Sequence, residues 1–167
     1  DGIRLMRGLL TKPNIESFSL VVRDITHSDI DLFYDGMVDL LKSHLEWHDF
    51  DSKKFKSWLE RAVDDPDTDT LLCFDGNAPA GYYVARTVTP IWSNERISSD
   101  VVLYVLEPYR GKGAAVALLR QWISNLKERG VKKALSGFSL RASEDHARDA
   151  YLRSGFSRLG EIYAKRL

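Results

Sequence analysis

The sequence contains 167 residues, 44% of them hydrophobic and 29% charged, and its 24 Lys and Arg balance its 24 Asp and Glu. This length and composition are typical of one globular domain with a substantial core, which we place at residues 17–167. No apolar run reaches the roughly 18 residues of a membrane span. The first residues also contain no signal-peptide core, so we expect a cytoplasmic protein that does not contact a membrane.

The first half of the chain is predicted to contain one strand and two helices after a loose arm at residues 1–16. The strand is indicated by alternating, β-prone residues, and the helices by apolar residues at helical spacing. In order, we expect a strand at 17–25, a helix at 30–45 that starts from Thr26, and a helix at 55–63 that ends before Pro66.

The second half is predicted to alternate strands with helices. In order, we expect a hairpin of strands 70–74 and 81–88 around Gly76, a loop at 90–96, a strand at 101–106, a helix from Ala114 to Gly130, a strand at 132–140, a helix at 144–154 and a last strand at 156–165. No internal repeat is visible. This order favours an α/β fold with a mixed sheet.

The segment 101–119 contains a predicted anion site. An apolar run, Val101–Leu106, is followed by a breaker segment with one Pro and two Gly, and then by an Ala- and Leu-rich helix. Free N–H groups in the first helical turn, together with the helix dipole, attract anions. Arg110 and Lys112 add two cations. The residues therefore predict a phosphate site, with a plain turn and helix cap as the alternative.

Two phosphate-binding signatures do not fit this segment. A P-loop needs Gly, four residues and then Gly-Lys-Ser/Thr, which the chain lacks. A dinucleotide fingerprint needs a small third residue, where this chain has Val116. Instead, Arg110-Gly111-Lys112-Gly113-Ala114-Ala115 resembles the Arg/Gln-x-x-Gly-x-Gly/Ala signature of the GNAT family, the GCN5-related N-acetyltransferases. The departure is the order Glu107-Pro108, since members often have Pro and then an acid.

A second motif carries the same resemblance. The segment 147–156 is similar to the later GNAT motif, with Ala147, Tyr151 and Gly155-Phe156 at matching spacing. The family's Asn, which hydrogen-bonds the pantetheine arm, falls on Glu144. The resemblance is strong over 97–156 and implies a GNAT fold, with a mixed central sheet of about six to seven strands and about four flanking helices. It also implies acetyl-CoA as the acyl donor and an amine of a small molecule, peptide or protein as the acceptor.

The resemblance also assigns candidate site residues. The pyrophosphate loop comprises Arg110, Gly111, Lys112, Gly113, Ala114 and Ala115, while Glu144 and the backbone of Leu103, Tyr104 and Val105 face the pantetheine arm. Acyl transfer needs a route for the amine proton and an acid for the leaving thiolate. Tyr151 matches the family's acid. Asp100, at the start of the strand, is our candidate base, with Glu144 and the acidic first half as competitors.

The resemblance also implies acceptor contacts between the first two helices, at Trp47, His48 and Phe50, where core packing of the aromatic residues is the alternative. His44 and His48 lack the pattern of a zinc protease, and we expect no metal. Residues 24–75 carry fourteen acidic and five basic side chains, and residues 76–167 carry eight and fifteen. The basic half suits CoA and the acidic half a cationic amine, although solvated helix faces would also explain this pattern.

Three further expectations concern redox state, partners and activity. Cys73 lies in an apolar run and is read as a buried, inert thiol. Nucleic-acid binding is not expected, because no aromatic platform or named motif accompanies the basic residues. A homodimer is compatible with the family. The alternative to an enzyme is a non-catalytic GNAT-fold module that binds CoA or a protein partner.

Overall fold

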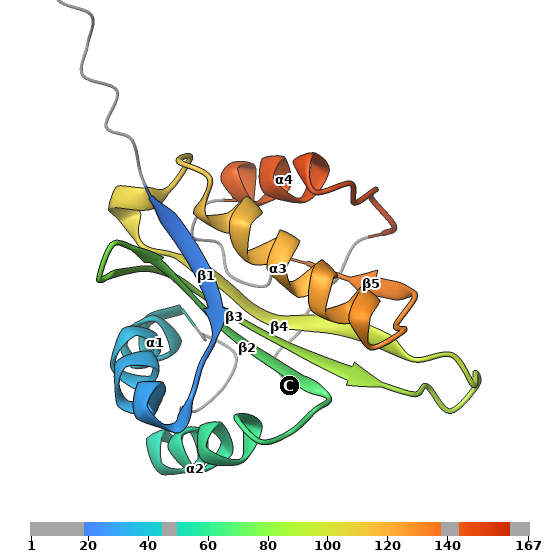
Figure 1. Cartoon of the computed structure of the whole chain (residues 1–167), viewed down its shortest axis with the longest axis horizontal. Coiled ribbons are helices and arrows are strands. Elements are labelled where there is room, and N and C mark those ends of the chain that lie inside the picture. The colour runs from blue at the N-terminus through green and yellow to red at the C-terminus, as the bar shows by residue number, and fades with distance from the viewer. Residues whose placement is uncertain (1–18, 45–49, 138–143, 161–167) are drawn as a thin grey trace, which may run out of the picture.

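The computed structural model describes residues 19–44, 50–137 and 144–160, and it contains one mixed sheet (Figure 1). The strands lie side by side in chain order: β1 (Leu20–Asp24), β2 (Thr68–Asp75), β3 (Ala78–Val88), β4 (Ile97–Val105) and β5 (Lys133–Leu135). Neighbours are antiparallel from β1 to β4, while β5 runs parallel to β4. The predicted α/β class with a mixed sheet is therefore confirmed.

Helices cover both faces of this sheet (Figure 1). On one face, α1 (Ile30–His44) and α2 (Ser52–Ala62) enclose a core that includes Phe33, Met37, Leu59 and Tyr82. On the other face, α3 (Ala114–Glu128) lies across β1 to β4 and contacts α4 (Glu144–Arg153). Its core includes Leu118, Trp122, Tyr83 and Tyr151. Tyr82 and Tyr83 are neighbours on β3 and face opposite layers, as strand alternation requires.

The helix starts follow from local capping. Asp29 accepts hydrogen bonds from the Thr26 backbone and hydroxyl, which closes the turn before α1. The carboxylate of Asp51 accepts from the N–H of Lys54 at 3.0 Å and caps α2. The helix start at Thr26 was predicted from the sequence, and it is confirmed.

Strand β4 contains a bulge that decides which side chains face α3 and α4. Val84 pairs with Val102, but the next residue of β3, Ala85, pairs with Asp100, so Val101 is an extra residue on β4. Beyond the bulge the alternation is shifted. Asp100 and Leu103 therefore both face the α3–α4 layer, where Asp100 contacts α4 and Leu103 packs in the core.

Strands β4 and β5 are paired over only three residues of each strand. Only Ile97–Ser99 pair with Lys133–Leu135, so Asp100 and Ser136 are the first residues beyond the paired region. The rest of β4 has no strand partner on this side within the described residues. Beyond this pairing, residues 100–105 of β4 lead to the start of α3, and Asp100 lies where the paired region ends.

Several expected element bounds differ from the structure. β4 begins at Ile97 rather than Val101, because its polar first residues pair with β3. The strand expected at 132–140 spans only Lys133–Leu135, and residues 138–143 lie outside the described part. Residues 156–160 of the expected last strand are not in a strand, and 161–167 are not described. The described residues therefore contain five of the six to seven expected strands, together with the four expected helices.

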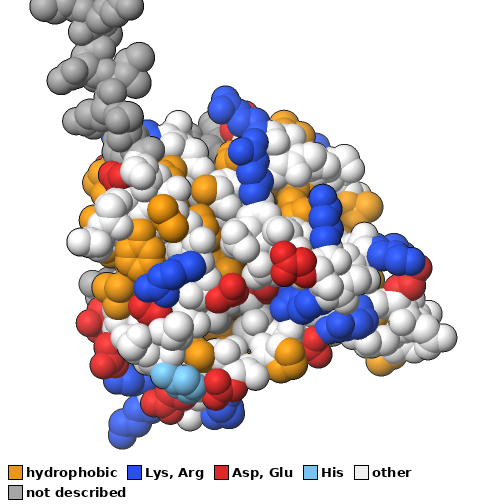
Figure 2. All heavy atoms as spheres, viewed as in Figure 1, with side chains coloured by type: hydrophobic (Ala, Val, Ile, Leu, Met, Phe, Trp, Pro, Cys, Tyr) orange, Lys and Arg blue, Asp and Glu red, His pale blue; other side chains and the backbone are white. Residues whose placement is uncertain are grey.

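Two further properties of the surface and helices bear on function. No helix among the described residues is both long and apolar enough to span a membrane. Charge is less segregated in space than along the sequence: Figure 2 shows Lys and Arg at the α1–α2 end of the molecule as well as over α3. Lys56 on α2 pairs with Asp31 on α1 at 2.7 Å. Ion pairing therefore offsets part of the acidic excess in this half.

Candidate active site

The predicted phosphate loop has the backbone that an anion site needs. A short 3-10 turn at Glu107–Tyr109 follows β4, and α3 begins at Ala114. Gly111 and Gly113 have φ angles of 72° and 97°, which residues with a side chain rarely adopt. The first N–H groups of α3 have no carbonyl partner inside the helix and point out of its start. The loop and helix start therefore fit a pyrophosphate group.

The two cations of this loop have different surroundings. The Arg110 Nε donates to the Val105 carbonyl at 3.1 Å, and its guanidinium lies 5.8 Å from the centre of the Tyr104 ring. Arg110 therefore ties the loop to the end of β4. Lys112 is exposed beside the two glycines. Ala114 is buried under the loop and Ala115 is partly buried.

The segment expected to face the pantetheine arm lies on the open side of β4. Leu103, Tyr104 and Val105 come after the region where β4 pairs with β5. Leu103 and Val105 pack toward α3, whereas Tyr104 packs toward α1 and α2. This segment of β4 therefore lies between the phosphate loop and Asp100.

Asp100 and Tyr151, the two predicted catalytic residues, are in direct contact. The Tyr151 hydroxyl lies 3.1 Å from Asp100 Oδ2 and 3.1 Å from the Gly137 carbonyl oxygen, both of which can accept its proton. Asp100 also accepts from the Ser136 hydroxyl at 2.6 Å and from the Gly137 N–H at 3.1 Å. The structure thus brings together β4, α4 and the segment after β5 around one carboxylate.

Burial controls the pKa values in this cluster. Burial raises the pKa of Asp100, and the hydrogen bonds from Ser136, Tyr151 and Gly137 lower it in part. Burial, followed by the charge of Asp100, raises the pKa of Tyr151 well above its usual value. Tyr83 on β3 is also buried beside this cluster, and its pKa is raised by burial and then by the charges of Asp100 and Tyr151. Both tyrosines are therefore protonated at neutral pH.

Sequence reasoning missed Ser136 and Gly137, which bind Asp100, and Tyr83, which is buried beside the cluster without contacting the carboxylate. A Ser-Gly pair after a strand is a common turn sequence, so only the register of β4 against β5 shows that it meets Asp100. Tyr83 follows Tyr82 in an apolar strand, where both would be taken as core residues. The bulge at Val101, which turns Asp100 and Leu103 to the same face, has no signal in an unbroken apolar run.

Some predicted residues lie outside the described part of the chain. Trp47 and His48 are not described. Glu144 begins α4, but its side chain is not described either. Phe50 is described and half-buried, and its ring lies 5.9 Å from that of Phe55. Phe55 in turn stacks with Tyr34 and Trp58. These contacts are those of the packing alternative, and the acceptor role of Phe50 stays a prediction.

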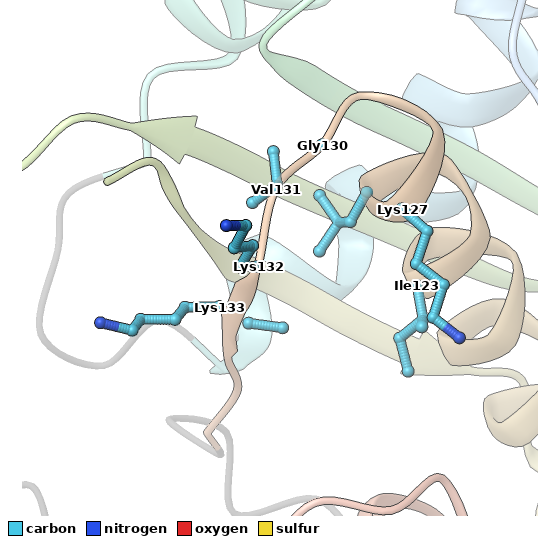
Figure 3. Close-up of a pocket in the computed structure, with 8 residues that line it drawn as sticks. Ile123, Lys127, Gly130, Val131, Lys132 and Lys133 are labelled. Atoms are coloured by element: carbon cyan, nitrogen blue, oxygen red, sulfur yellow. The ribbon is translucent and has the colours of Figure 1, made fainter. Parts of the chain in front are cut away.

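Two other features lie apart from Asp100 and the phosphate loop. A pocket of about 470 Å³ is lined by residues 123–134 of α3 and β5, including Lys127, Lys132 and Lys133 (Figure 3). It adjoins Gly130, at the opposite end of α3 from the phosphate loop. Cys73 is fully buried, and burial raises the pKa of its thiol to about 11, which confirms the expected inert thiol.

Three solved structures with the same fold are distant in sequence. A predicted acetyltransferase with acetyl-CoA from Clostridium acetobutylicum is 16% identical, with a TM-score of 0.69 over 88% of this chain and 96% of that one. A ribosomal-protein-alanine N-acetyltransferase from Brucella melitensis is 19% identical, with a TM-score of 0.66 over 89% and 99%. An aminoglycoside acetyltransferase from an uncultured soil metagenomic sample is 12% identical, with a TM-score of 0.66 over 89% and 97%.

At these identities the likeness establishes the fold and nothing finer. No curated protein matches the chain by sequence. A family model, however, matches residues 34–156, which include the phosphate loop, Asp100 and Tyr151, and its description is the acetyltransferase (GNAT) family. The chain therefore belongs to this family of acetyl-CoA-dependent N-acetyltransferases.

Proposed function

We propose that this protein transfers the acetyl group of acetyl-CoA to an amine by direct attack in a ternary complex. The loop from Arg110 to Ala115 holds the pyrophosphate, and the open edge of β4 at 103–105 holds the pantetheine arm. Tyr151 protonates the leaving thiolate, and Asp100 accepts the amine proton. The observation that carries the proposal is the 3.1 Å contact between Tyr151 and Asp100, where the pairing of β4 with β5 ends.

The acceptor is proposed to be an amine of a small molecule, a peptide or a protein. The names of the similar structures mention a ribosomal-protein alanine and aminoglycosides, which makes peptide N-termini and aminoglycosides the first acceptors to screen. Polyamines form a third class, suited to the acidic first half. Free-thiol detection reports CoA release for every class. We place the acceptor near the segment that joins α1 and α2.

A matched pair of glycine variants tests the phosphate loop. Gly113 and Gly130 flank the two ends of α3, and both have positive φ angles, of 97° and 71°. A valine at either position imposes a similar backbone strain, of about 1–2 kcal/mol. Gly113→Val should abolish calorimetric binding of acetyl-CoA, whereas Gly130→Val should retain it. Equal affinities in the two variants would contradict the placement of the pyrophosphate.

The non-catalytic alternative predicts a different result from the same assays. A binding module would bind acetyl-CoA and release no thiol with any acceptor class. An enzyme would bind acetyl-CoA and release thiol with one class, at a rate that depends on Tyr151. We favour the enzyme because an acid and a carboxylate meet where the thioester is expected.

A further inference from the structure

The carboxylate of Asp100 is held by neutral donors. Its two oxygens accept from the hydroxyls of Ser136 and Tyr151 and from the N–H of Gly137. Within the described residues, no Lys or Arg forms an ion pair with it. A half-buried carboxylate without a cation is stabilised less in its charged form than an ion-paired one, which favours exchange of its proton.

The Tyr151 hydroxyl is placed to exchange a proton with this carboxylate. Its single proton has two acceptors at 3.1 Å, Asp100 Oδ2 and the Gly137 carbonyl oxygen. When the proton points to Gly137, a lone pair of the Tyr151 oxygen can face Asp100. Rotation of one hydroxyl therefore changes Tyr151 from a donor toward Asp100 into an acceptor from it.

We propose that Asp100 and Tyr151 form one closed proton relay, in which the proton lost by the attacking amine is delivered to the leaving sulfur. This inference rests on the proposed acetyl transfer. The neutral amine nitrogen forms a bond to the thioester carbon and gives a proton to Asp100, directly or through one water. The C–S bond then breaks, the Tyr151 proton goes to sulfur, and the Asp100 proton goes to the Tyr151 oxygen.

The protons and charges of this sequence balance without another reactant. The amine nitrogen loses one proton, the thiolate gains one, and both Asp100 and Tyr151 return to their starting states. Acetyl-CoA enters as a substrate and leaves as the free thiol. An acceptor that is an ammonium ion in solution releases its first proton to water before it attacks.

The relay also explains how so weak an acid could act. Burial and the charge of Asp100 raise the pKa of Tyr151 well above that of a thiol, ordinarily about 8.5. Proton transfer from Tyr151 to a thiolate is therefore uphill while Asp100 is ionised. Once Asp100 carries the amine proton, its charge is gone, and it can replace the proton that Tyr151 gives up. The same contact thus weakens the acid before attack and strengthens it afterwards.

Ser136 is a positioning residue in this arrangement, and Tyr83 provides a control. Ser136 donates to Asp100 Oδ2, the oxygen that also meets Tyr151. Tyr83 is buried near the pair, and its hydroxyl makes no hydrogen bond of good geometry within the described part of the chain, although its proximity to Ser136 lowers its pKa in part. The other charged group that affects Tyr83 is Asp69 on β2. Tyr83→Phe therefore removes a hydroxyl from the same environment without breaking the relay.

A double-mutant cycle tests whether the two residues act as one unit. Asp100→Asn and Tyr151→Phe should each lower kcat by roughly 10²–10⁴-fold with little change in acetyl-CoA affinity. In a closed relay, the double variant should be no slower than the slower single variant, within about threefold. Losses that multiply would show an independent acid and base and would overturn the relay. Tyr83→Phe should stay within a few-fold of the wild type.

A second measurement needs neither acceptor nor acetyl-CoA. The pKa of Asp100 can be followed by carbon NMR of protein labelled in its Asp carboxyl groups. Because the Tyr151 hydrogen bond lowers the pKa of Asp100, Tyr151→Phe should raise it, and Tyr83→Phe should change it less. An unchanged pKa in Tyr151→Phe would overturn the contact. A wild-type protein that shows this coupling but releases no thiol with any acceptor would instead refute the proposed acetyl transfer.

Discussion

Two aspartates, Asp69 and Asp100, lie on either side of Ala85 in one row across the sheet. Asp69 on β2 pairs with Ala85 on β3, and Ala85 pairs with Asp100 on β4. Both carboxylates point to the α3–α4 face. Asp69 is only 1% exposed, and it accepts hydrogen bonds from the guanidinium of Arg129 and the side-chain amide of Asn125, both from α3. Asp100 accepts hydrogen bonds from two hydroxyls and one backbone N–H.

The difference between these sites is the presence of a cation. At Asp69, a positive charge compensates the buried negative charge, and Arg129 also donates to the Pro66 carbonyl at 2.8 Å. Such a pair fixes α3 on the sheet. At Asp100, burial without a cation raises the pKa, which favours proton exchange. We infer that one row of the sheet holds a structural carboxylate and a reactive one.

The largest expected effect is on turnover, in Asp100→Asn. We expect kcat to fall by roughly 10²–10⁴-fold. Stability should not fall, because the pKa of Asp100 is raised on folding. A carboxyl with a raised pKa stabilises the fold most below its unfolded pKa, and that contribution is lost as pH rises through the folded pKa. Asn carries no charge, so at neutral pH the variant should melt at or above the wild-type temperature.

Thermal denaturation of Asp100→Asn, beside thiol-release kinetics, checks both halves of this expectation. A variant that loses activity and also melts far below the wild type would show that Asp100 is a structural residue like Asp69. The comparison between the two aspartates would then fail.

Arg129→Met should give the largest loss of stability. It removes the cation from a nearly inaccessible carboxylate, and breaking such a pair from one side costs about 3 kcal/mol. For a chain of this length, we expect a fall in melting temperature of roughly 10 °C. Arg120→Met is a matched control, because Arg120 is exposed on the same helix. Equal melting temperatures in the two variants would contradict a structural role for the Asp69 pair.

Ser136→Ala should have a smaller effect, confined to catalysis. A hydrogen bond to a charged group contributes about 1.5–3 kcal/mol, so we expect kcat to fall by roughly 10- to 100-fold with KM little changed. Because the Ser136 bond lowers the pKa of Asp100, its loss raises that pKa further. Asp100 must be ionised to accept a proton, so activity should be lost at a higher pH on the acid side.

Ser99→Ala is the control for this variant, because Ser99 is exposed on β4 beside Asp100. A pH–rate profile of kcat separates positioning from general damage. If Ser136→Ala lowered kcat without moving the acid limb, Ser136 would not act through Asp100.

The sequence predicts the parts of this site better than their assembly. The glycines of the phosphate loop and Tyr151 lie in motifs, so their elements could be placed in advance. Asp100 and Tyr151 are 51 residues apart, however, and no local pattern shows that they touch. Their contact depends on the bulge at Val101, since strict alternation would place Asp100 on the same face as Tyr104.

The bounds of β4 show the same limit of local patterns. Hydrophobicity predicts a start at Val101, yet the strand begins at Ile97 because Ser98 is buried and accepts a hydrogen bond from the Trp122 indole at 3.2 Å. A buried polar residue with a partner from a distant helix is invisible to a hydrophobic pattern. The pairing of β4 with β5 is short and leaves residues 100–105 of β4 without a strand partner on that side within the described residues. This too is a property of the sheet and not of either strand.

The smallest expected effect extends the comparison to a third aspartate, Asp29, which is paired near the surface. The Arg23 guanidinium donates to both of its oxygens, at 2.7 and 2.8 Å, and the Thr26 backbone and hydroxyl donate as well. The Arg23 hydrogen bond, against the effect of burial, lowers the pKa of Asp29 far below its usual value. Because Arg23 is 46% exposed, solvent weakens the pair, and we expect Asp29→Asn to cost about 1 kcal/mol at neutral pH.

The pH dependence of this third site should be opposite in sign to that of Asp100. A carboxyl with a lowered folded pKa contributes its full stability above the unfolded pKa of about 4, and loses it as pH falls towards the folded pKa. The difference in unfolding free energy between wild type and Asp29→Asn, measured in urea, should therefore be constant above about pH 5 and shrink in acid. For Asp100→Asn the sign is opposite. The variant should be at least as stable as the wild type at neutral pH, and any excess stability of the variant should shrink as the pH falls. Acid dependence of the same sign in both variants would mean that the cation does not decide which of these carboxylates holds the fold and which exchanges a proton.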